Sequence, residues 1–192
     1  MFLIIGSAFI LTGSAQSVNY KDYYGYRNQI KTGIGVAYHQ GEYLTGYSLF
    51  AKYHYYLNKN ISLAPEFSVM NFTKDEDELL HIIRQEALQA NVQVYLLQRI
   101  KYSFFVGGGV NIGLTHQAIS NHSLTGEYVI SDYHIVPNSH KTFNQFTGGY
   151  NLIIGLGFQI TPLMSVEFTE LYQNGTEGNN IWHTRIGFLV KF

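Results

Sequence analysis

The last residues of the chain, Trp182 to Phe192, read WHTRIGFLVKF, and this stretch decides the fold. One set of alternate positions is almost wholly apolar: Trp182, Thr184, Ile186, Phe188, Val190 and Phe192. The intervening positions are mainly polar or small and include His183, Arg185, Gly187 and Lys191. A repeat of two residues is the pattern of a β-strand with one apolar and one polar face, because successive side chains point to opposite sides of the strand.

The same alternation recurs along almost the whole chain. It predicts eight strands, at residues 30–39, 47–57, 61–69, 88–96, 104–114, 146–159, 165–172 and 182–192. Short connections follow the second, fourth and sixth strands, and longer ones follow the others, the longest being 116–144. Short turns on one rim and long loops on the other are typical of outer-membrane proteins. The sequence therefore predicts an all-β fold: an eight-stranded antiparallel up-and-down transmembrane β-barrel with both termini in the periplasm.

The composition fits a chain that hides its surface from water. Hydrophobic residues make up 46%, aromatic residues 16% and charged residues only 13%, about half the usual charged share of a soluble domain. The net charge of −1 gives no basic surface, so we expect no direct binding of nucleic acid. The absence of cysteine excludes thiolate zinc sites, and we expect neither a metal nor a cofactor. We expect lipid to cover the apolar face, which indicates the bacterial outer membrane.

A soluble, lipocalin-like barrel of eight strands is the main structural alternative. Such a barrel turns its apolar face inward and needs an exterior rich in Lys and Glu. Here the polar face is instead built mainly from Gly, Ser, Asn and Gln with scattered charges, which suits a small and crowded lumen. The membrane barrel is the better interpretation.

The N-terminus carries the features of an export signal. Residues 2–11 form an apolar run that is too short to span a bilayer as a helix. Gly13 and Ala15 supply the small residues of a cleavage site before Gln16, although no Lys or Arg precedes the apolar run. We therefore expect a signal peptide at 1–15, a periplasmic segment at 16–29 and the barrel at 30–192.

Six charged residues fall on the polar face of the predicted strands. An isolated buried charge is costly, so in a narrow barrel we expect these groups to pair across the lumen and plug it. A narrow selective pore lined by the same groups is the alternative. The residues are Lys31, Lys52, Glu66, Glu167, Arg185 and Lys191.

Aromatic residues gather near the strand ends, as in the interfacial girdles of membrane barrels. The expected girdle comprises Tyr38, Tyr47, Tyr55, Tyr95, Tyr102, Tyr150, Phe158 and Trp182. The chain also ends on Phe188, Val190 and Phe192, and this run is similar to the C-terminal assembly signal of outer-membrane barrels. Lipid and the barrel-assembly machinery are therefore expected partners.

Two loops carry polar residues that need a functional interpretation. In residues 73–85 an acidic run, 75–78, follows Thr73, and the Thr73-x-x-Glu76 spacing matches a capping box, so a short helix over the rim is one expectation. Residues 116–144 hold the residue types of a hydrolytic triad, namely His116, Ser120, His122, Ser123 and Glu127. The His-x-Ser-Asn order of lipid A deacylase barrels is absent. We therefore predict that the protein is not an enzyme.

The stretch from about Gln85 to Phe192 resembles the TraO family of conjugative transposons. The resembling features are Tyr95-Leu96-Leu97 before a turn, the Gly-rich strands around 107–113 and from Gly148, Gly175-Thr176, and Arg185-Ile186-Gly187 before the terminal Phe192. The resemblance implies an envelope component of a DNA-transfer apparatus that works through protein partners, and it carries over no catalytic residues. The resulting hypothesis is a non-enzymatic outer-membrane barrel that acts through its surface loops. A general OmpA- or OmpX-like structural or adhesion barrel, a narrow pore and, less favoured, a lipid-modifying barrel enzyme are the alternatives.

Overall fold

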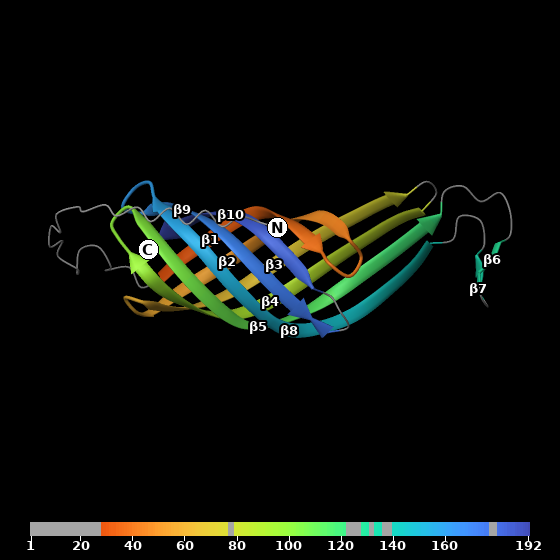
Figure 1. Ribbon diagram of the computed structural model, residues 1–192, viewed down its shortest axis with the longest axis horizontal. Coiled ribbons are helices and arrows are strands. Elements are labelled where there is room, and N and C mark those ends of the chain that lie inside the picture. Colours follow the sequence, from red (N-terminus) through yellow and green to blue (C-terminus); the bar gives the residue numbers. More distant parts are fainter. Residues whose placement is uncertain (1–27, 77–78, 122–127, 131–132, 136–139, 177–179) are drawn as a thin grey trace, which may run out of the picture.

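The computed structural model describes residues 28–76, 79–121, 128–130, 133–135, 140–176 and 180–192, with side chains for 28–74, 81–118, 144–176 and 180–192 (Figure 1). The expected signal peptide and nearly all of the expected periplasmic segment lie outside these residues. Within them, no helix is long and apolar enough to cross a membrane. The strands are β1 (Asn28–His39), β2 (Leu44–Asn58), β3 (Ile61–Glu76), β4 (Leu79–Gln98), β5 (Tyr102–Asn121), β6 (Tyr128–Ile130), β7 (Tyr133–Ile135), β8 (His140–Gln159), β9 (Met164–Gly175) and β10 (Ile181–Lys191).

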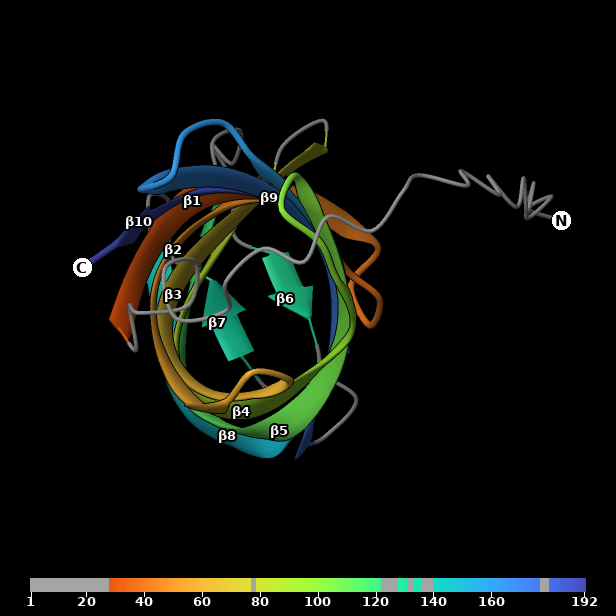
Figure 2. The same cartoon turned by 90° about the vertical axis from the view of Figure 1, so that its left-hand side faces the viewer.

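Eight of these strands close into one antiparallel barrel, in the order β1-β10-β9-β8-β5-β4-β3-β2. Each strand pairs with its neighbours along the chain, and β1 pairs with β10 to complete the circle, as the view along the axis in Figure 2 shows. Strands β6 and β7 form a separate small hairpin between β5 and β8. The predicted eight-stranded up-and-down barrel is confirmed, and β1 begins at Asn28 rather than at Ile30.

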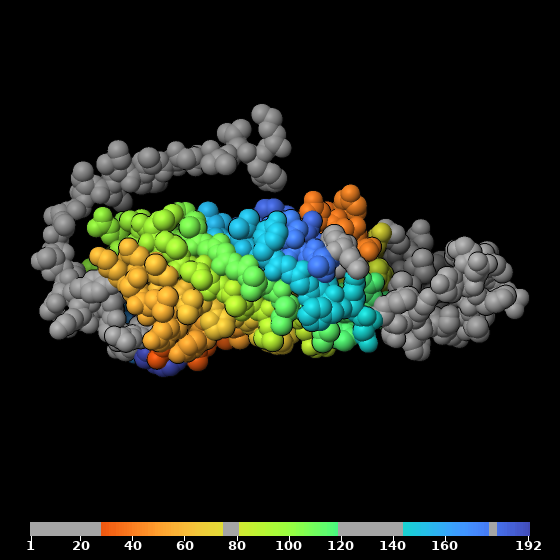
Figure 3. All heavy atoms as spheres, turned by 90° about the horizontal axis from the view of Figure 1, so that it is seen from below, coloured from red at the N-terminus to blue at the C-terminus, as the bar shows by residue number. Residues whose placement is uncertain are grey.

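The barrel has a polar interior and an apolar exterior. Lumen-facing Lys31 and Gln93 are fully buried, whereas Ile34 is 59% exposed and Phe188 is 55% exposed on the outside. A soluble barrel has the opposite arrangement, so the lipocalin-like alternative is wrong. The continuous wall that lipid meets is visible in Figure 3, where spheres of β3, β4, β5 and β8 lie against one another.

Four neighbouring strands are longer than the other four. β3 has 16 residues and β4, β5 and β8 have 20 each, whereas β2 has 15, β1 and β9 have 12 and β10 has 11. The long strands project toward the rim of the long loops (Figure 1). The expectation of a loop and short helix at residues 73–85 is wrong, because β3 runs to Glu76 and β4 starts at Leu79, directly opposite it. The alternation simply continues: Phe72 pairs with Ile83, and both side chains are buried inside the barrel, so the hairpin outcompetes a local cap.

The exterior of these long strands changes from apolar to polar partway along. One register row joins Asn71, Arg84, His116 and Asn144 across β3, β4, β5 and β8. In this region Arg84 is ion-paired with Glu86 at 2.7 Å, and His116 Nδ1 lies 2.7 Å from Asn144 Oδ1. A polar row cannot lie in hydrocarbon without cost, so the membrane ends below it. We name the strands from this row outward, residues 71–76, 79–84, 116–121 and 140–144, the outer wall.

On the described strands outside the outer wall, the exterior carries Glu86 of β4, which is ion-paired with Arg84, and one further charge, Glu170 of β9. It is exposed and its register partner on β10 is Thr184, one pleat from the aromatic pair Tyr172 and Trp182. Its register partner on β8 is Ile154, so Glu170 lies within the apolar band, where a carboxylate costs less than a Lys or Arg side chain.

The apolar exterior predicts a depth-dependent effect of charge. Val92 lies on β4 about midway between Arg84 of the polar row and the β4–β5 turn, is 44% exposed, and has the uncharged register partners Leu63 and Gly108. We expect Val92→Arg to destabilise the barrel by about 2–4 kcal/mol, because the guanidinium would lie near the bilayer midplane. Denaturant unfolding in liposomes measures the change, with Val92→Leu as the matched control. An unchanged midpoint for Val92→Arg would mean that this face does not meet lipid.

Candidate functional site

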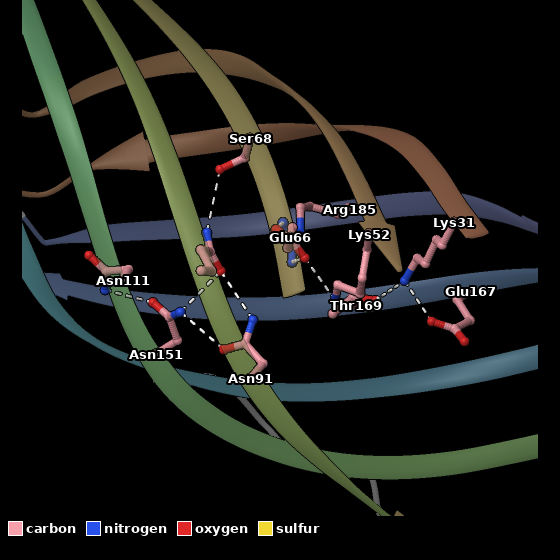
Figure 4. Close-up of polar contacts among 11 residues, drawn as sticks. Lys31, Lys52, Glu66, Ser68, Asn91, Asn111, Asn151, Glu167, Thr169 and Arg185 are labelled. Carbon is pink, nitrogen blue, oxygen red and sulfur yellow. Dashed lines mark hydrogen bonds and ion pairs between the residues drawn. The ribbon is translucent and has the colours of Figure 1, made fainter. Parts of the chain in front are cut away.

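Five of the six predicted lumen charges meet inside the barrel. The Nζ of Lys31 (β1) donates to Glu167 Oε2 (β9) at 2.6 Å and to Thr169 Oγ1 at 3.0 Å. On the opposite side Lys52 (β2) approaches Glu66 Oε2 (β3) at 2.8 Å, and Arg185 (β10) forms a two-pronged ion pair with the same carboxylate. Figure 4 shows these side chains converging from five strands. We name these residues the ion cluster.

Strand register and small residues position the ion cluster. Lys52 is opposite Lys31 on one side and Glu66 on the other, so adjacent strands bring the three groups to one level. A Cβ on Gly187 would collide with the side chain of Lys31, so only glycine leaves the space that this lysine occupies. The ring of Phe50 fills the centre, with Arg185 Cζ 4.4 Å and Lys31 Nζ 5.4 Å from its centroid, and it adds cation–π contacts to both cations.

The sixth charge lies apart from the ion cluster. Lys191 is half-buried at the short-turn rim, where its Nζ donates to Gln159 Oε1 at 3.1 Å. Strand β10 runs from the cluster at Arg185 to this rim, so two residues of the same polar face lie at different depths. The alternation of the sequence identifies the face of β10 on which Lys191 lies, but it carries no information about how deep in the barrel the residue lies.

A network of amides fills the lumen beside the ion cluster. Asn151 Nδ2 donates to Gln89 Oε1 at 3.0 Å and to Asn91 Oδ1 at 3.1 Å, and Asn111 Nδ2 donates to Asn151 Oδ1 at 2.8 Å. Gln89 Nε2 also reaches Ser68 Oγ at 3.4 Å (Figure 4). In the sequence these residues are recognisable only as members of a polar face. Their mutual bonding depends on which strands become neighbours.

Apolar groups close the lumen at two further levels. Toward the long-loop end seven buried residues form an inner cap: Ala37, Leu44, Met70, Phe72, Ile83, Ala87 and Ile181. Toward the short-turn end a second cluster contains Tyr95, Phe105, Ile153 and Leu171, with Tyr56 packed against it. Neither cluster was expected, because apolar residues on the polar face are isolated along the sequence and come together only across strands.

The placement of Tyr95 in the aromatic girdle is wrong. Tyr95 is only 4% exposed and points into the lumen, where the Tyr56 hydroxyl donates to its hydroxyl oxygen at 2.7 Å. Tyr95 continues the series of alternate residues Gln89, Asn91 and Gln93, all of which face inward. The alternation of β4 therefore already assigned it to the lumen.

The other expected girdle residues are on the exterior. All of them are exposed: Tyr38, Tyr47, Tyr55, Tyr102, Tyr150, Phe158 and Trp182. The terminal residues Phe188, Val190 and Phe192 also face outward. Tyr172, which the sequence reasoning omitted, joins the girdle by packing on Trp182 with a centroid separation of 4.8 Å.

The residue types of a hydrolytic triad remain largely outside the described side chains. His116 is on the exterior of the outer wall against Asn144, while no side-chain position is described for Ser120, His122, Ser123 or Glu127. Among the described residues, no group of three His, Cys, Asp or Glu residues is arranged to hold a metal ion.

Comparison with known proteins identifies the fold but no family. No family model and no curated protein matches the chain. Among solved structures, Neisserial surface protein A is 14% identical, covers 88% of this chain and 97% of its own, and has a TM-score of 0.59. The attachment invasion locus protein of Yersinia pestis is 13% identical, with coverage of 86% and 97% and a TM-score of 0.56. The outer membrane protein OprG of Pseudomonas aeruginosa is 14% identical, with coverage of 87% and 96% and a TM-score of 0.57.

These similarities and the apolar exterior agree with each other. The chain is a small eight-stranded β-barrel of the bacterial outer membrane. The short turns therefore face the periplasm, and the outer wall stands on the extracellular side.

The shared carboxylate of the ion cluster predicts a large loss of stability when its charge is removed. Glu66→Gln would leave Arg185 and Lys52 buried without a counter-ion, and breaking a buried pair in this way costs about 3–5 kcal/mol. The free energy of unfolding in guanidinium measures the effect. Glu170→Gln, which removes an exposed carboxylate, is the matched control and should change stability little. Equal effects of the two substitutions would contradict the ion cluster as a structural plug.

Proposed function

We propose that this protein is a non-conducting, non-enzymatic outer-membrane barrel that binds a partner at its extracellular end. The observation that carries the proposal is the outer wall, in which four paired strands continue beyond the apolar band. A barrel that served only as a membrane anchor would not need strands that extend beyond the apolar band. The proposal follows the general OmpA- or OmpX-like interpretation, with adhesion or docking as the activity.

The filled lumen supports a role other than transport. The ion cluster, the amide network and the inner cap occupy successive levels, and their buried charges are paired with each other. An ion that crossed the barrel would have to displace these pairs, which is costly in a low-dielectric interior. The narrow-pore alternative therefore receives no support from the arrangement of the lumen.

A truncated barrel tests the proposed surface. Lys74 is opposite His81, and Ala118 is opposite Thr142, so deleting residues 75–80 and 119–141 and inserting Asn-Gly at each junction keeps the remaining register. We expect the truncated protein to fold, with a mobility shift between boiled and unboiled gel samples, but to lose adhesion when displayed on cells. Adhesion equal to that of the full chain would overturn the proposal.

Planar-bilayer recordings test the closed lumen. We expect silent recordings for the full chain at neutral pH, because the paired charges obstruct the barrel. The protein with Glu66, Arg185 and Lys52 all changed to Ala is the comparison and should also be silent, because the inner cap and the cluster around Tyr95 still close the lumen. Regular conductance steps from the unmodified chain would contradict the closed lumen.

A role in conjugation is a narrower form of the same proposal. Its support is the resemblance of residues 85–192 to the TraO family, which implies docking within a DNA-transfer apparatus. Mating assays in which the donor carries the truncated barrel would test it. We expect transfer to fall to the level of a deletion strain, and normal transfer would restrict the protein to a general adhesion role.

A further inference from the structure

The periplasmic mouth of the barrel contains a pocket of about 270 Å³. The turns between β2 and β3, β4 and β5, and β8 and β9 surround it, at the end that faces the viewer in Figure 2. Its size is close to the lower end of the range of small-molecule sites, roughly 300–1,000 Å³. The volume is comparable to that of a short peptide or a small organic acid.

The pocket is closed toward the membrane interior. Tyr56 and Tyr95 line its inner end, with ring centroids 5.5 Å apart and their hydroxyls hydrogen-bonded. Phe105 packs against Tyr95 at 5.3 Å and is fully buried with Leu171 behind it. A solute that enters from the periplasm therefore meets an aromatic floor and has no path onward.

Positive charge dominates the lining. Lys59, Arg99 and Lys191 come from three different parts of the mouth, and Glu167 is the one carboxylate among the lining residues. The charge of Glu167 is already balanced by Lys31, whose Nζ lies 2.6 Å from it. The described lining therefore carries three cations and one ion-paired carboxylate, and a concave site with an excess of one sign of charge concentrates ions of the opposite sign.

We propose that this pocket binds a small soluble anion with a carboxylate or phosphate group from the periplasm. The planar guanidinium of Arg99 matches either group in a two-pronged hydrogen bond, and the two lysines of the lining add positive charge. The tyrosine floor provides an apolar surface and hydroxyl groups for the rest of the ligand. The pocket lies at the opposite end from the outer wall, so the proposal is independent of extracellular binding.

Calorimetric titration of the folded protein in zwitterionic detergent tests the pocket. The probes are tri-alanine with a free carboxylate, tri-alanine amide and inorganic phosphate. We expect the free acid, phosphate or both to bind at millimolar concentration or below, and the amide to bind more weakly. Binding of the acid identifies a carboxylate ligand, and binding of phosphate alone identifies a phosphate ligand. Absence of binding by both anions, or equal binding of acid and amide, would overturn the proposal.

Matched variants locate the binding site. Arg99→Gln should weaken anion binding about tenfold or more, because the two-pronged charge-assisted hydrogen bond is lost. Lys101→Gln is the control, since Lys101 is exposed in the same β4–β5 turn but does not line the pocket. Gel mobility before and after boiling verifies that all variants fold. If Lys101→Gln weakened anion binding equally, the effect would reflect general surface charge, and the assignment of the binding site to the pocket would be overturned.

A competition experiment distinguishes a soluble anion from a lipid headgroup as the ligand of the pocket. Adding phosphatidylglycerol to the micelles should leave the affinity for the soluble probe unchanged if the pocket opens to the periplasm. Complete competition by this lipid would overturn the assignment to a soluble ligand, because a headgroup would then occupy the pocket.

Discussion

In hydrocarbon, every backbone N–H and C=O group must find its partner within the protein, and the pairing of β1 with β10 meets this requirement. Without that closure two strand edges would face lipid, at a cost of several kcal/mol for each unsatisfied group. The remaining features follow from it. A closed barrel has an inside and an outside, so strict alternation sends one half of the side chains to lipid and the other half into a narrow lumen.

The narrow lumen then determines which residues can face inward. An eight-stranded barrel has only enough interior space for side chains to fill it. Long charged groups such as Arg185 and Lys31 fit because Gly35 leaves room for Arg185 and Gly187 leaves room for Lys31. Their burial is tolerated because Glu66 and Glu167 neutralise them at close range. The filled interior also explains why the candidate binding surfaces are at the two ends of the barrel.

The two ends differ because the strands differ in length. On the periplasmic side tight turns surround a concave, positively charged mouth with an aromatic floor. On the extracellular side four paired strands extend past the membrane. The first arrangement suits a small solute, and the second suits a larger partner. The same barrel thus offers two chemically distinct surfaces that are separated by a plug.

The sequence by itself determined the strand count, the side of the barrel wall on which almost every residue lies, and the membrane environment. The reason is that the alternation of side chains along a strand depends only on local backbone geometry. The sequence also identified the charges that enter the lumen. Tertiary structure decided the depth of each residue, since depth depends on the register between strands far apart in the chain. Only the register brings Glu66 to Arg185, sets Lys191 apart at the rim and joins Tyr56 to Tyr95. It also extends β3 and β4 through residues whose local pattern favoured a helix, because cross-strand pairs such as Phe72 with Ile83 outweigh a capping box.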